Sequence, residues 1–217
     1  MDFEVARTNM VESQIRTWDV LDQRILDVLL DLRREEFVPE AYRHLAFGDL
    51  DLPLGHGQTM LSPKLEARLV QELGLGPDDR VLEVGTGSGY STALLCRLAA
   101  HVHSIEVIPE FSRAAAARLA ARDIRNATLE VGDAAAGWAR HAPYDAIVIG
   151  GSVPVLPDEF KDQLAVGGRL VAVIGRAPAM TATLVVCVAP GVFTVTGLFE
   201  TSIPSLLHAR EPARFVF

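Results

Sequence analysis

Cysteine, basic residues and long apolar runs are scarce in this sequence, and each shortage excludes a class of protein. The two cysteines, Cys96 and Cys187, form no disulfide framework and lack metal-ligand spacing, so we expect both in the core. The six histidines are scattered, and no metal site is predicted. Lys and Arg number 20 against 28 Asp and Glu, which argues against a nucleic-acid partner. No uncharged stretch reaches the roughly 18 residues of a membrane span and the first residues lack a secretion signal, which predicts a cytoplasmic protein without a membrane partner.

Apolar residues, in contrast, are plentiful. They make up 49% of the 217 residues, against 22% charged residues, which is enough for one substantial core but short for two full domains. We therefore expect a single domain over residues 1–217. An amino-terminal part, residues 1–60, precedes a sheet core over residues 61–217.

The stretch VLEVGTGSGY, residues 81–90, is the most informative motif, because an apolar strand leads into a turn with three glycines. A dinucleotide fingerprint places its third glycine where this chain has Tyr90, so NAD is disfavoured. The G-x-G-x-G spacing with an acid two residues ahead resembles the first motif of class I S-adenosylmethionine-dependent methyltransferases. The predicted cofactor contacts here are Glu83, Gly85, Thr86, Gly87, Ser88 and Gly89.

Three later apolar segments also end at an acid or at glycines. Residues 101–107 close on Glu106, about one βα unit further on, where a doubly wound sheet places the carboxylate that binds ribose hydroxyls. Residues 127–131 lead to Asp133, and residues 144–149 lead to a Gly-Gly pair. Alone, Asp133 fits an ordinary Gly-Asp turn equally well. In this series of strand ends, Glu106 and Asp133 are predicted cofactor contacts.

The amino-terminal part shows helical spacing and then a long irregular stretch. Residues 10–32 predict two helices with a break near Asp19 and Asp22, and the mixed charges of residues 33–36 predict a solvated helix end. Residues 40–59 predict a long connecting loop, and such loops are usually functional. Ser62 as N-cap, Pro63 at the first helical position and Gly74 past the end then predict a helix.

The second half predicts strands that lack intervening helices. A helix over residues 157–164 is followed by expected strands at 169–175, 183–188, 193–199 and 213–217. Without crossover helices these strands must pair antiparallel. The expected fold is therefore α/β, a mostly parallel, doubly wound Rossmann-like sheet of the class I methyltransferase type with an antiparallel end and an amino-terminal helical extension.

Further segments carry a family resemblance over nearly the whole chain. LPLGHGQT at 52–59, the glycine motif, Gly132-Asp133 and APYDAI at 142–147 together resemble the protein-L-isoaspartate O-methyltransferase family, as do Met10-Val11-Glu12, Phe37-Val38-Pro39, residues 164–170 and residues 214–216. The resemblance implies methyl transfer from S-adenosyl-L-methionine to the free carboxylate of isoaspartyl or D-aspartyl residues in damaged proteins. Residues 55–59 would then belong to an acceptor-peptide site. There, glycines allow close approach of a peptide, and Gln58 and Thr59 offer donors to a carboxylate.

One position departs from the family pattern, because Leu61 stands where the family has a serine two residues before the proline. Either the adjacent Ser62 supplies the hydroxyl, which makes it a catalytic candidate beside Gln58 and Thr59, or Ser62 is only the helix N-cap. No general base is needed, because an aspartyl-type carboxylate is already ionised at neutral pH. His56 is accordingly expected to be a surface or packing residue rather than a base.

Two hypotheses of different classes follow from these residues. The first is an isoaspartyl protein carboxyl methyltransferase, supported by Gln58, Thr59 and the complete cofactor motif. The alternative is a methyltransferase-fold protein that binds the cofactor but has changed its acceptor or acts only in binding, supported by Leu61. Methyl transfer to an isoaspartyl peptide distinguishes the two.

Overall fold

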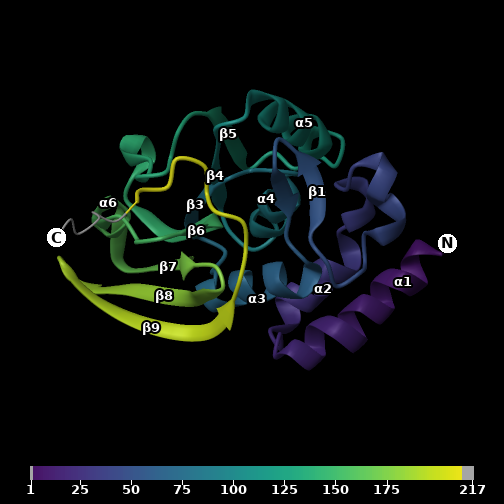
Figure 1. Ribbon diagram of the computed structural model, residues 1–217, viewed down its shortest axis with the longest axis horizontal. Coiled ribbons are helices and arrows are strands. Elements are labelled where there is room, and N and C mark those ends of the chain that lie inside the picture. Colours follow the sequence, from purple (N-terminus) through teal and green to yellow (C-terminus); the bar gives the residue numbers. More distant parts are fainter. Residues whose placement is uncertain (1, 212–217) are drawn as a thin grey trace.

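The structure is a computed structural model that describes residues 2–211, and a seven-stranded sheet forms the centre of this part (Figure 1). The strand order is β5-β4-β3-β6-β7-β8-β9. The strands are β3 (Arg80–Val84), β4 (His101–Glu106), β5 (Ala127–Val131), β6 (Tyr144–Val153), β7 (Leu164–Arg176), β8 (Ala179–Ala189) and β9 (Val192–Thr201). All four parallel strands predicted from the sequence are therefore present. The strand order reverses between β3 and β6, which lie side by side and pair in parallel.

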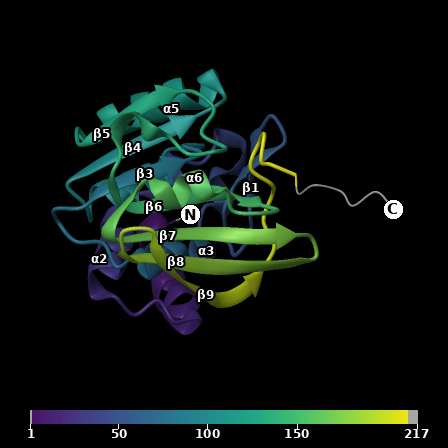
Figure 2. The same cartoon turned by 90° about the vertical axis from the view of Figure 1, so that its left-hand side faces the viewer.

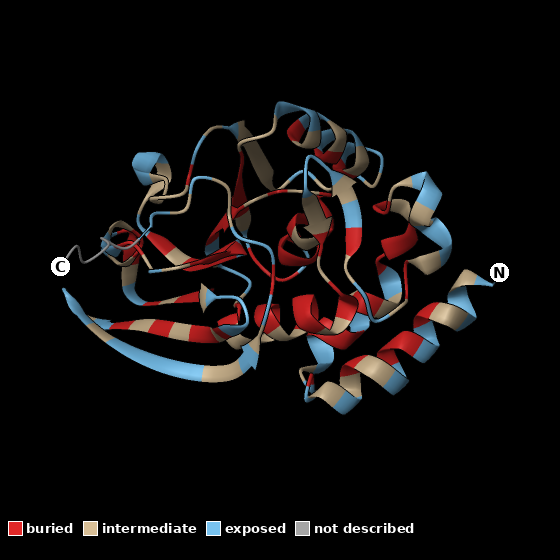
Figure 3. Cartoon of the chain, viewed as in Figure 1, coloured by how far each residue is buried: buried red, intermediate tan, exposed pale blue. Residues whose placement is uncertain are grey.

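The sheet is parallel from β5 to β7 and antiparallel from β7 to β9, as the missing crossover helices predict. Figure 2 shows β7, β8 and β9 side by side as one long ribbon. These three strands are longer than expected. A short hairpin turn lets β7 and β8 pair over a long stretch, from Arg169 opposite Val186 to Arg176 opposite Ala179. The further strand expected at 213–217 lies outside the described residues. In Figure 3 the pale blue of β9 marks it as the exposed edge.

Helices cover both faces of the sheet. They are α3 (Pro63–Leu73), α4 (Tyr90–Cys96), α5 (Pro109–Ala120) and α6 (Asp158–Asp162). Alternate residues of a strand point to opposite faces. On β3, Val81 therefore enters a larger core shared with α3, α4 and α5, while Leu82 enters a smaller core that contains Phe160 of α6. The expected doubly wound α/β fold is confirmed. Both cysteines are buried and unbridged, as predicted.

The amino-terminal part contains the two predicted helices with a break between them. Helix α1 spans Phe3–Met10 and continues through one π-helical turn to Ile15 and a 3-10 turn at Arg16–Trp18. The chain then breaks at Asp19, which has a left-handed backbone with φ of 60°. Helix α2 spans Gln23–Asp31, and the Asp22 side chain caps it by accepting from Arg24 N. The first helix thus begins seven residues before its predicted start at Met10.

The charged run at 33–36 is not the solvated helix end that its composition predicts. It forms a 3-10 helix, Arg34–Glu36, in which Arg34 and Glu35 are buried. Each finds an opposite charge from a distant part of the chain: Arg34 pairs with Glu66 of α3, and Glu35 pairs with Arg7 of α1. Partners 28 and 32 residues away are invisible to local composition, which is why the prediction was wrong.

The stretch at 40–59 is also more ordered than a connecting loop. A 3-10 helix spans Glu40–Leu45, and a hairpin of β1 (Leu52–Gly55) and β2 (Gln58–Met60) follows. Its turn is made by three successive residues with positive φ: Gly55 at 98°, His56 at 51° and Gly57 at 71°. Gly55 and Gly57, which interrupt any helical periodicity in the sequence, are the residues that this tight turn requires.

Helix α3 starts and stops as predicted, with Pro63 at its first position and Gly74 in a left-handed C-cap. Ser62 occupies the N-cap position, but in the described chain its hydroxyl makes no capping hydrogen bond. Among residues 2–211, no helix has the length and apolarity required to cross a membrane.

Candidate functional site

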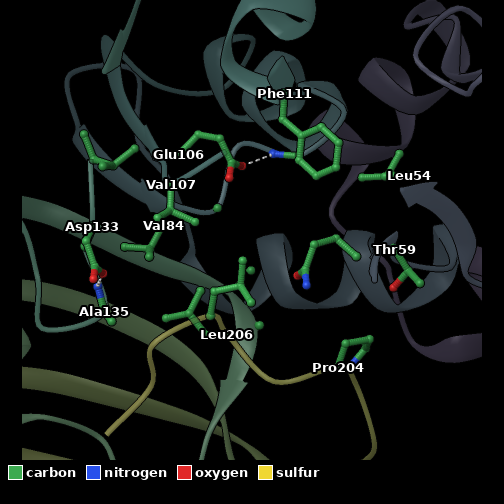
Figure 4. Close-up of a pocket in the computed structure, with 18 of the residues that line it drawn as sticks. Leu54, Thr59, Val84, Glu106, Val107, Phe111, Asp133, Ala135, Pro204 and Leu206 are labelled. Atoms are coloured by element: carbon green, nitrogen blue, oxygen red, sulfur yellow. Dashed lines mark hydrogen bonds between the residues drawn. The ribbon is translucent and has the colours of Figure 1, made fainter. Parts of the chain in front are cut away.

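The carboxyl ends of the parallel strands open into a pocket, where ligands bind in open α/β sheets (Figure 4). We call it the Glu106 lobe. The hairpin region and the glycine turn form one part of its lining, with Leu54, Gln58, Thr59, Leu61, Gly85 and Gly87. The ends of the parallel strands form a second part, with Glu106, Val107, Phe111, Gly132, Asp133, Ala134, Ala135, Gly150 and Gly151. Pro204, Leu206 and Leu207, near the end of the described chain, complete it. In Figure 4 Thr59 and Leu54 face Glu106 across this space.

A second cavity, the Glu83 lobe, lies beneath the glycine turn. Its lining includes Glu66 of α3, Glu83, Thr86 and Ser88. The two lobes share Leu54, Thr59, Leu61, Gly85, Gly87 and Gly150. Because one set of residues forms the wall between them, we treat the lobes as two parts of one elongated site.

The glycine turn adopts a backbone that only glycine tolerates readily. Gly85, Gly87 and Gly89 have φ of 94°, 53° and 82°. Gly89 lies at the N-cap of α4, and a Cβ there would approach Ala115 Cβ to 2.8 Å. Within the described chain Gly89 lines neither lobe, so it allows α4 to pack on α5 while Gly85 and Gly87 face the site.

Glu106 is held in place before any ligand arrives. Its Oε2 accepts from Gly87 N at 2.8 Å and its Oε1 accepts from Ile108 N at 2.9 Å. Carboxylate oxygens have further lone pairs, so this fixed carboxylate can still accept from two neighbouring hydroxyls. The geometry fits the predicted ribose contact.

Glu83 is buried at the end of β3 and is one of the residues that line its lobe. Its Oε2 accepts from Thr92 Oγ1 at 2.5 Å and from Ser104 Oγ at 2.6 Å. Its Oε1 is buried without a hydrogen-bond partner among the described residues. Burial raises the pKa of Glu83 to about 7, although the hydroxyl groups of Ser104, Thr92 and Ser91 oppose the rise. An unpaired buried acceptor is costly, so this oxygen fits a ligand that brings a donor.

Asp133 lies at the other end of the site, after β5. Its Oδ1 accepts from Ala135 N at 3.0 Å, the contact drawn in Figure 4, and its Oδ2 lies 2.8 Å from His208 Nδ1. Partial burial alone would raise the pKa of Asp133, but the Ala135 N–H and His208 bring it below its usual value. The carboxylate is therefore ionised at neutral pH and available to a donor on a ligand ring.

The wall formed by residues 203–207 was not predicted from the sequence. Ser152, completely buried in β6, accepts a hydrogen bond at its carbonyl from Leu206 N at 2.9 Å and donates from its own N–H to Pro204 O at 2.9 Å. Its hydroxyl also donates to Ile203 O at 3.2 Å. A strand-like bridge between Ser152 and Ser205 completes the attachment. No local pattern signals a contact across more than 50 residues.

The hairpin brings two of the three predicted acceptor-site residues to the pocket. Gln58 lines the Glu106 lobe and Thr59 lines both lobes, with Thr59 Oγ1 buried and unpaired in the described chain. Ser62 lines neither lobe among residues 2–211, whereas Leu61 lines both. His56 lies at the hairpin tip with its ring 5.5 Å from that of Phe111, consistent with a packing residue.

The structure also gathers histidines that are scattered in the sequence. His103 of β4 stacks on His141 at 4.1 Å between ring centroids, and His141 Nε2 lies 2.7 Å from Glu130 Oε1. Donor atoms of these three residues lie within 4.8 Å of one another, a spacing from which a metal ion can be held. Glu130 also accepts from Trp138 Nε1 and Arg140, and within the described chain the cluster lines neither lobe. Spacing along the sequence does not reveal this cluster, since its members come from three separate segments.

Comparison with known proteins agrees with this fold. The sequence profile of protein-L-isoaspartate(D-aspartate) O-methyltransferase matches residues 6–189. Protein-L-isoaspartate O-methyltransferase 1 of Rhodopseudomonas palustris is 44% identical over 173 residues, which cover 80% of this chain and 71% of the relative. The enzyme of the same name from Anaeromyxobacter is 45% identical over 162 residues, 74% of this chain and 76% of the relative.

Solved structures share this fold. A protein-L-isoaspartate O-methyltransferase superposes with a TM-score of 0.80 at 26% identity, covering 92% of this chain and 65% of that longer chain. A Plasmodium falciparum structure titled as a putative enzyme of this type, in complex with S-adenosyl-L-homocysteine, has a TM-score of 0.77 at 20% identity and covers 92% and 97% of the two chains. At 20% identity, the Plasmodium falciparum structure supports only the fold of this chain.

The sheet order, its antiparallel end and a two-lobed site at the strand ends define a class I S-adenosylmethionine-dependent methyltransferase. Within that class, the chain belongs to the protein-L-isoaspartate(D-aspartate) O-methyltransferase family.

Proposed function

We propose that this enzyme transfers a methyl group from S-adenosyl-L-methionine to the free carboxylate of isoaspartyl or D-aspartyl residues in damaged proteins. The observation that carries the proposal is the position of the hairpin. Gln58 and Thr59 line the same lobe as Glu106 and Asp133, so donors for an acceptor carboxylate lie beside the predicted cofactor contacts. We also propose a cytoplasmic location and no nucleic-acid partner, consistent with the unbridged cysteines and the excess of acidic residues.

The described residues fit this cofactor. Glu106 is positioned to accept from ribose hydroxyls, Asp133 from the adenine amino group, and the free Oε1 of Glu83 from the ammonium group of the methionine part. Gly85 and Gly87 let the main chain approach the ligand, and Thr86 and Ser88 belong to the same turn. When bound, the cofactor supplies an electrophilic methyl group.

The protein's contribution to the chemistry is orientation. The acceptor carboxylate is ionised at neutral pH, so no residue has to remove a proton from it. Gln58 is placed to donate to that carboxylate, and Thr59 Oγ1 is a buried hydroxyl that lacks a partner in the described chain. Apolar walls such as Leu54 and Phe111 exclude water from the nucleophile. Holding the two reacting groups in line can supply several kcal/mol of the barrier.

Transfer of a tritiated methyl group from the cofactor to an isoaspartyl peptide tests this function directly. We expect incorporation into the isoaspartyl peptide, followed by release of volatile methanol, and none into the same peptide with normal aspartate. The alternative function, a changed acceptor or a binding role, motivated by Leu61, predicts cofactor binding without incorporation into any isoaspartyl peptide.

The position of Leu61 leads to a prediction about rate. Leu61 lines both lobes and Ser62 lines neither, so a hydroxyl restored by Leu61→Ser enters the site. We expect that variant to methylate isoaspartyl peptide faster, by up to about tenfold, because one added hydrogen bond contributes roughly 0.5–1.5 kcal/mol. Ser62→Ala is the matched control and should leave the rate within about twofold, given that its hydroxyl makes no cap bond in the described chain. A slower Leu61→Ser enzyme, or a large loss in Ser62→Ala, would place the acceptor hydroxyl elsewhere.

The raised pKa of Glu83 predicts that cofactor affinity depends on pH. With a pKa of about 7, the side chain is mostly neutral at pH 6 and mostly ionised at pH 8. Because only the ionised form attracts an ammonium group, S-adenosylhomocysteine should bind roughly tenfold more weakly at pH 6 than at pH 8. Calorimetric titration at both pH values measures this ratio. In Glu83→Gln the ratio should fall close to one, and an unchanged ratio in that variant would assign the titration to another group.

A further inference from the structure

Arg34 is a buried cation that forms hydrogen bonds at the base of the β1–β2 hairpin. Its side chain is completely buried, and each guanidinium nitrogen donates to a different acceptor. Nε donates to Ala46 O at 2.9 Å, Nη1 to Glu66 Oε2 at 2.5 Å and Nη2 to Leu61 O at 2.5 Å. Its Cζ also lies 4.8 Å from the centre of the Tyr90 ring. A single side chain thus joins the segment before the hairpin, the residue after it, and α3.

The location of Leu61 makes this contact important for the site. Leu61 lies between the end of β2 and the start of α3, and it lines both lobes. Its carbonyl oxygen is the atom that Arg34 holds. Any shift of this carbonyl moves the adjoining strand, which carries Gln58 and Thr59.

A hydrogen bond also holds the other strand of the hairpin, β1, at its base. Asp51 immediately precedes β1, and its Oδ1 accepts from Ser62 N at 2.7 Å. Leu52 and Met60 pack into the core and hold the base of the hairpin there, but apolar contacts have no directional preference. Hydrogen bonds have a directional preference, and a rigid guanidinium group fixes both the donor–acceptor distance and the angle of each hydrogen bond.

Stability alone does not account for this arrangement. Removing two charges from water costs several kcal/mol per ion, and well-packed apolar residues of similar volume often stabilise a protein as much as a buried ion pair. Burial raises the pKa of the Glu66 carboxyl, and the adjacent Arg34 charge opposes that rise. What the fork adds over an apolar residue is a defined geometry for three main-chain and side-chain acceptors.

We propose that Arg34 is a positioning residue that sets the orientation of the acceptor hairpin toward the bound cofactor, acting through the Leu61 carbonyl and Glu66. This proposal rests on the methyl-transfer function above. Arg34 has no exposed surface and lines neither lobe in the described part of the chain, so its effect on the reaction is indirect.

Arg34→Lys tests the proposal, because a lysine keeps the charge near Glu66 but cannot reach three acceptors at once. We expect the KM for an isoaspartyl peptide to rise at least about fivefold, while the Kd of S-adenosylhomocysteine changes less than about twofold. Hydrogen exchange of the amides at 58–62 should also become at least about fivefold faster. Glu66→Gln keeps the size of the side chain and removes only its charge. It should shift the KM and the exchange in the same direction, and it carries the test if Arg34→Lys does not fold.

Arg169→Lys is the matched control. Arg169 makes the same kind of fork, to Leu73 O and Gly74 O at 2.7 Å each and to Asp79 Oδ2 at 2.7 Å, but at the far end of α3. This variant should lose thermal stability and leave both the peptide KM and the exchange at 58–62 unchanged. If Arg34→Lys only lowers the melting temperature, as the control does, the positioning role is wrong. If the parent protein methylates no isoaspartyl peptide, the proposed function fails, and hydrogen exchange alone then decides the role of Arg34.

Discussion

Gly87→Val is expected to abolish cofactor binding, lowering the affinity for S-adenosylhomocysteine by at least about 100-fold, while the chain still folds. Gly87 has φ of 53°, a left-handed backbone that costs an L-residue about 1–2 kcal/mol and a β-branched residue more. A Cβ there would lie 3.3 Å from Leu54 Cδ1 of the hairpin, and Gly87 lines both lobes. The valine branches therefore enter the space of the ligand. Titration calorimetry measures the loss.

Gly74→Val provides the matched control for this substitution. Gly74 has φ of 55°, and nothing in the described chain lies within 4 Å of a Cβ built there. Both variants introduce the same kind of backbone strain, so both should melt at a lower temperature than the parent. Only Gly87→Val should lose the ligand. A folded Gly87→Val protein that binds as tightly as the parent would show that the glycine turn does not face the cofactor.

The sheet was predictable because its signals are local. The segment before the glycine turn and the segment before Asp133 each become a strand within one residue of the expected bounds. The first is buried from Val81 to Val84, as a parallel strand covered on both faces requires, whereas the second is β5, the partly buried edge strand of the sheet. Acids and glycines at the strand ends could also be predicted, because parallel strands bring their carboxyl ends to one edge. Glu106 and Asp133 consequently line one lobe.

What the sequence did not reveal depends on contacts between distant segments. Arg34 and Glu35 belong to a charged run that resembles a solvated surface, yet both are buried because Glu66 and Arg7 neutralise them. The wall at residues 203–207 likewise exists because Ser152 of β6, about 50 residues earlier in the chain, holds it by hydrogen bonds. Composition within a window of ten residues carries no information about such partners. The contributions of Phe111 and Leu54 to the site were missed for the same reason, since each is an ordinary apolar residue until the fold brings it to the pocket.

Glu106→Ala is expected to weaken binding of S-adenosylhomocysteine by about 5- to 150-fold, which corresponds to roughly 1–3 kcal/mol for buried donors left without an acceptor. The carboxylate now accepts from Gly87 N and Ile108 N, so its removal also frees the glycine turn that shapes the pocket. Glu110→Ala is the control, since this nearby acid of α5 is exposed and its loss should leave the affinity unchanged. Calorimetry on the two variants and the parent, with NAD as a competing ligand, measures the difference. Unchanged affinity in Glu106→Ala would remove Glu106 from the cofactor site, and tighter binding of NAD than of S-adenosylhomocysteine by the parent would contradict the cofactor assignment. The predicted order of affinities is parent and Glu110→Ala above Glu106→Ala and Glu106→Ala above Gly87→Val, because Glu106→Ala removes acceptors from the site whereas Gly87→Val fills the space of the ligand.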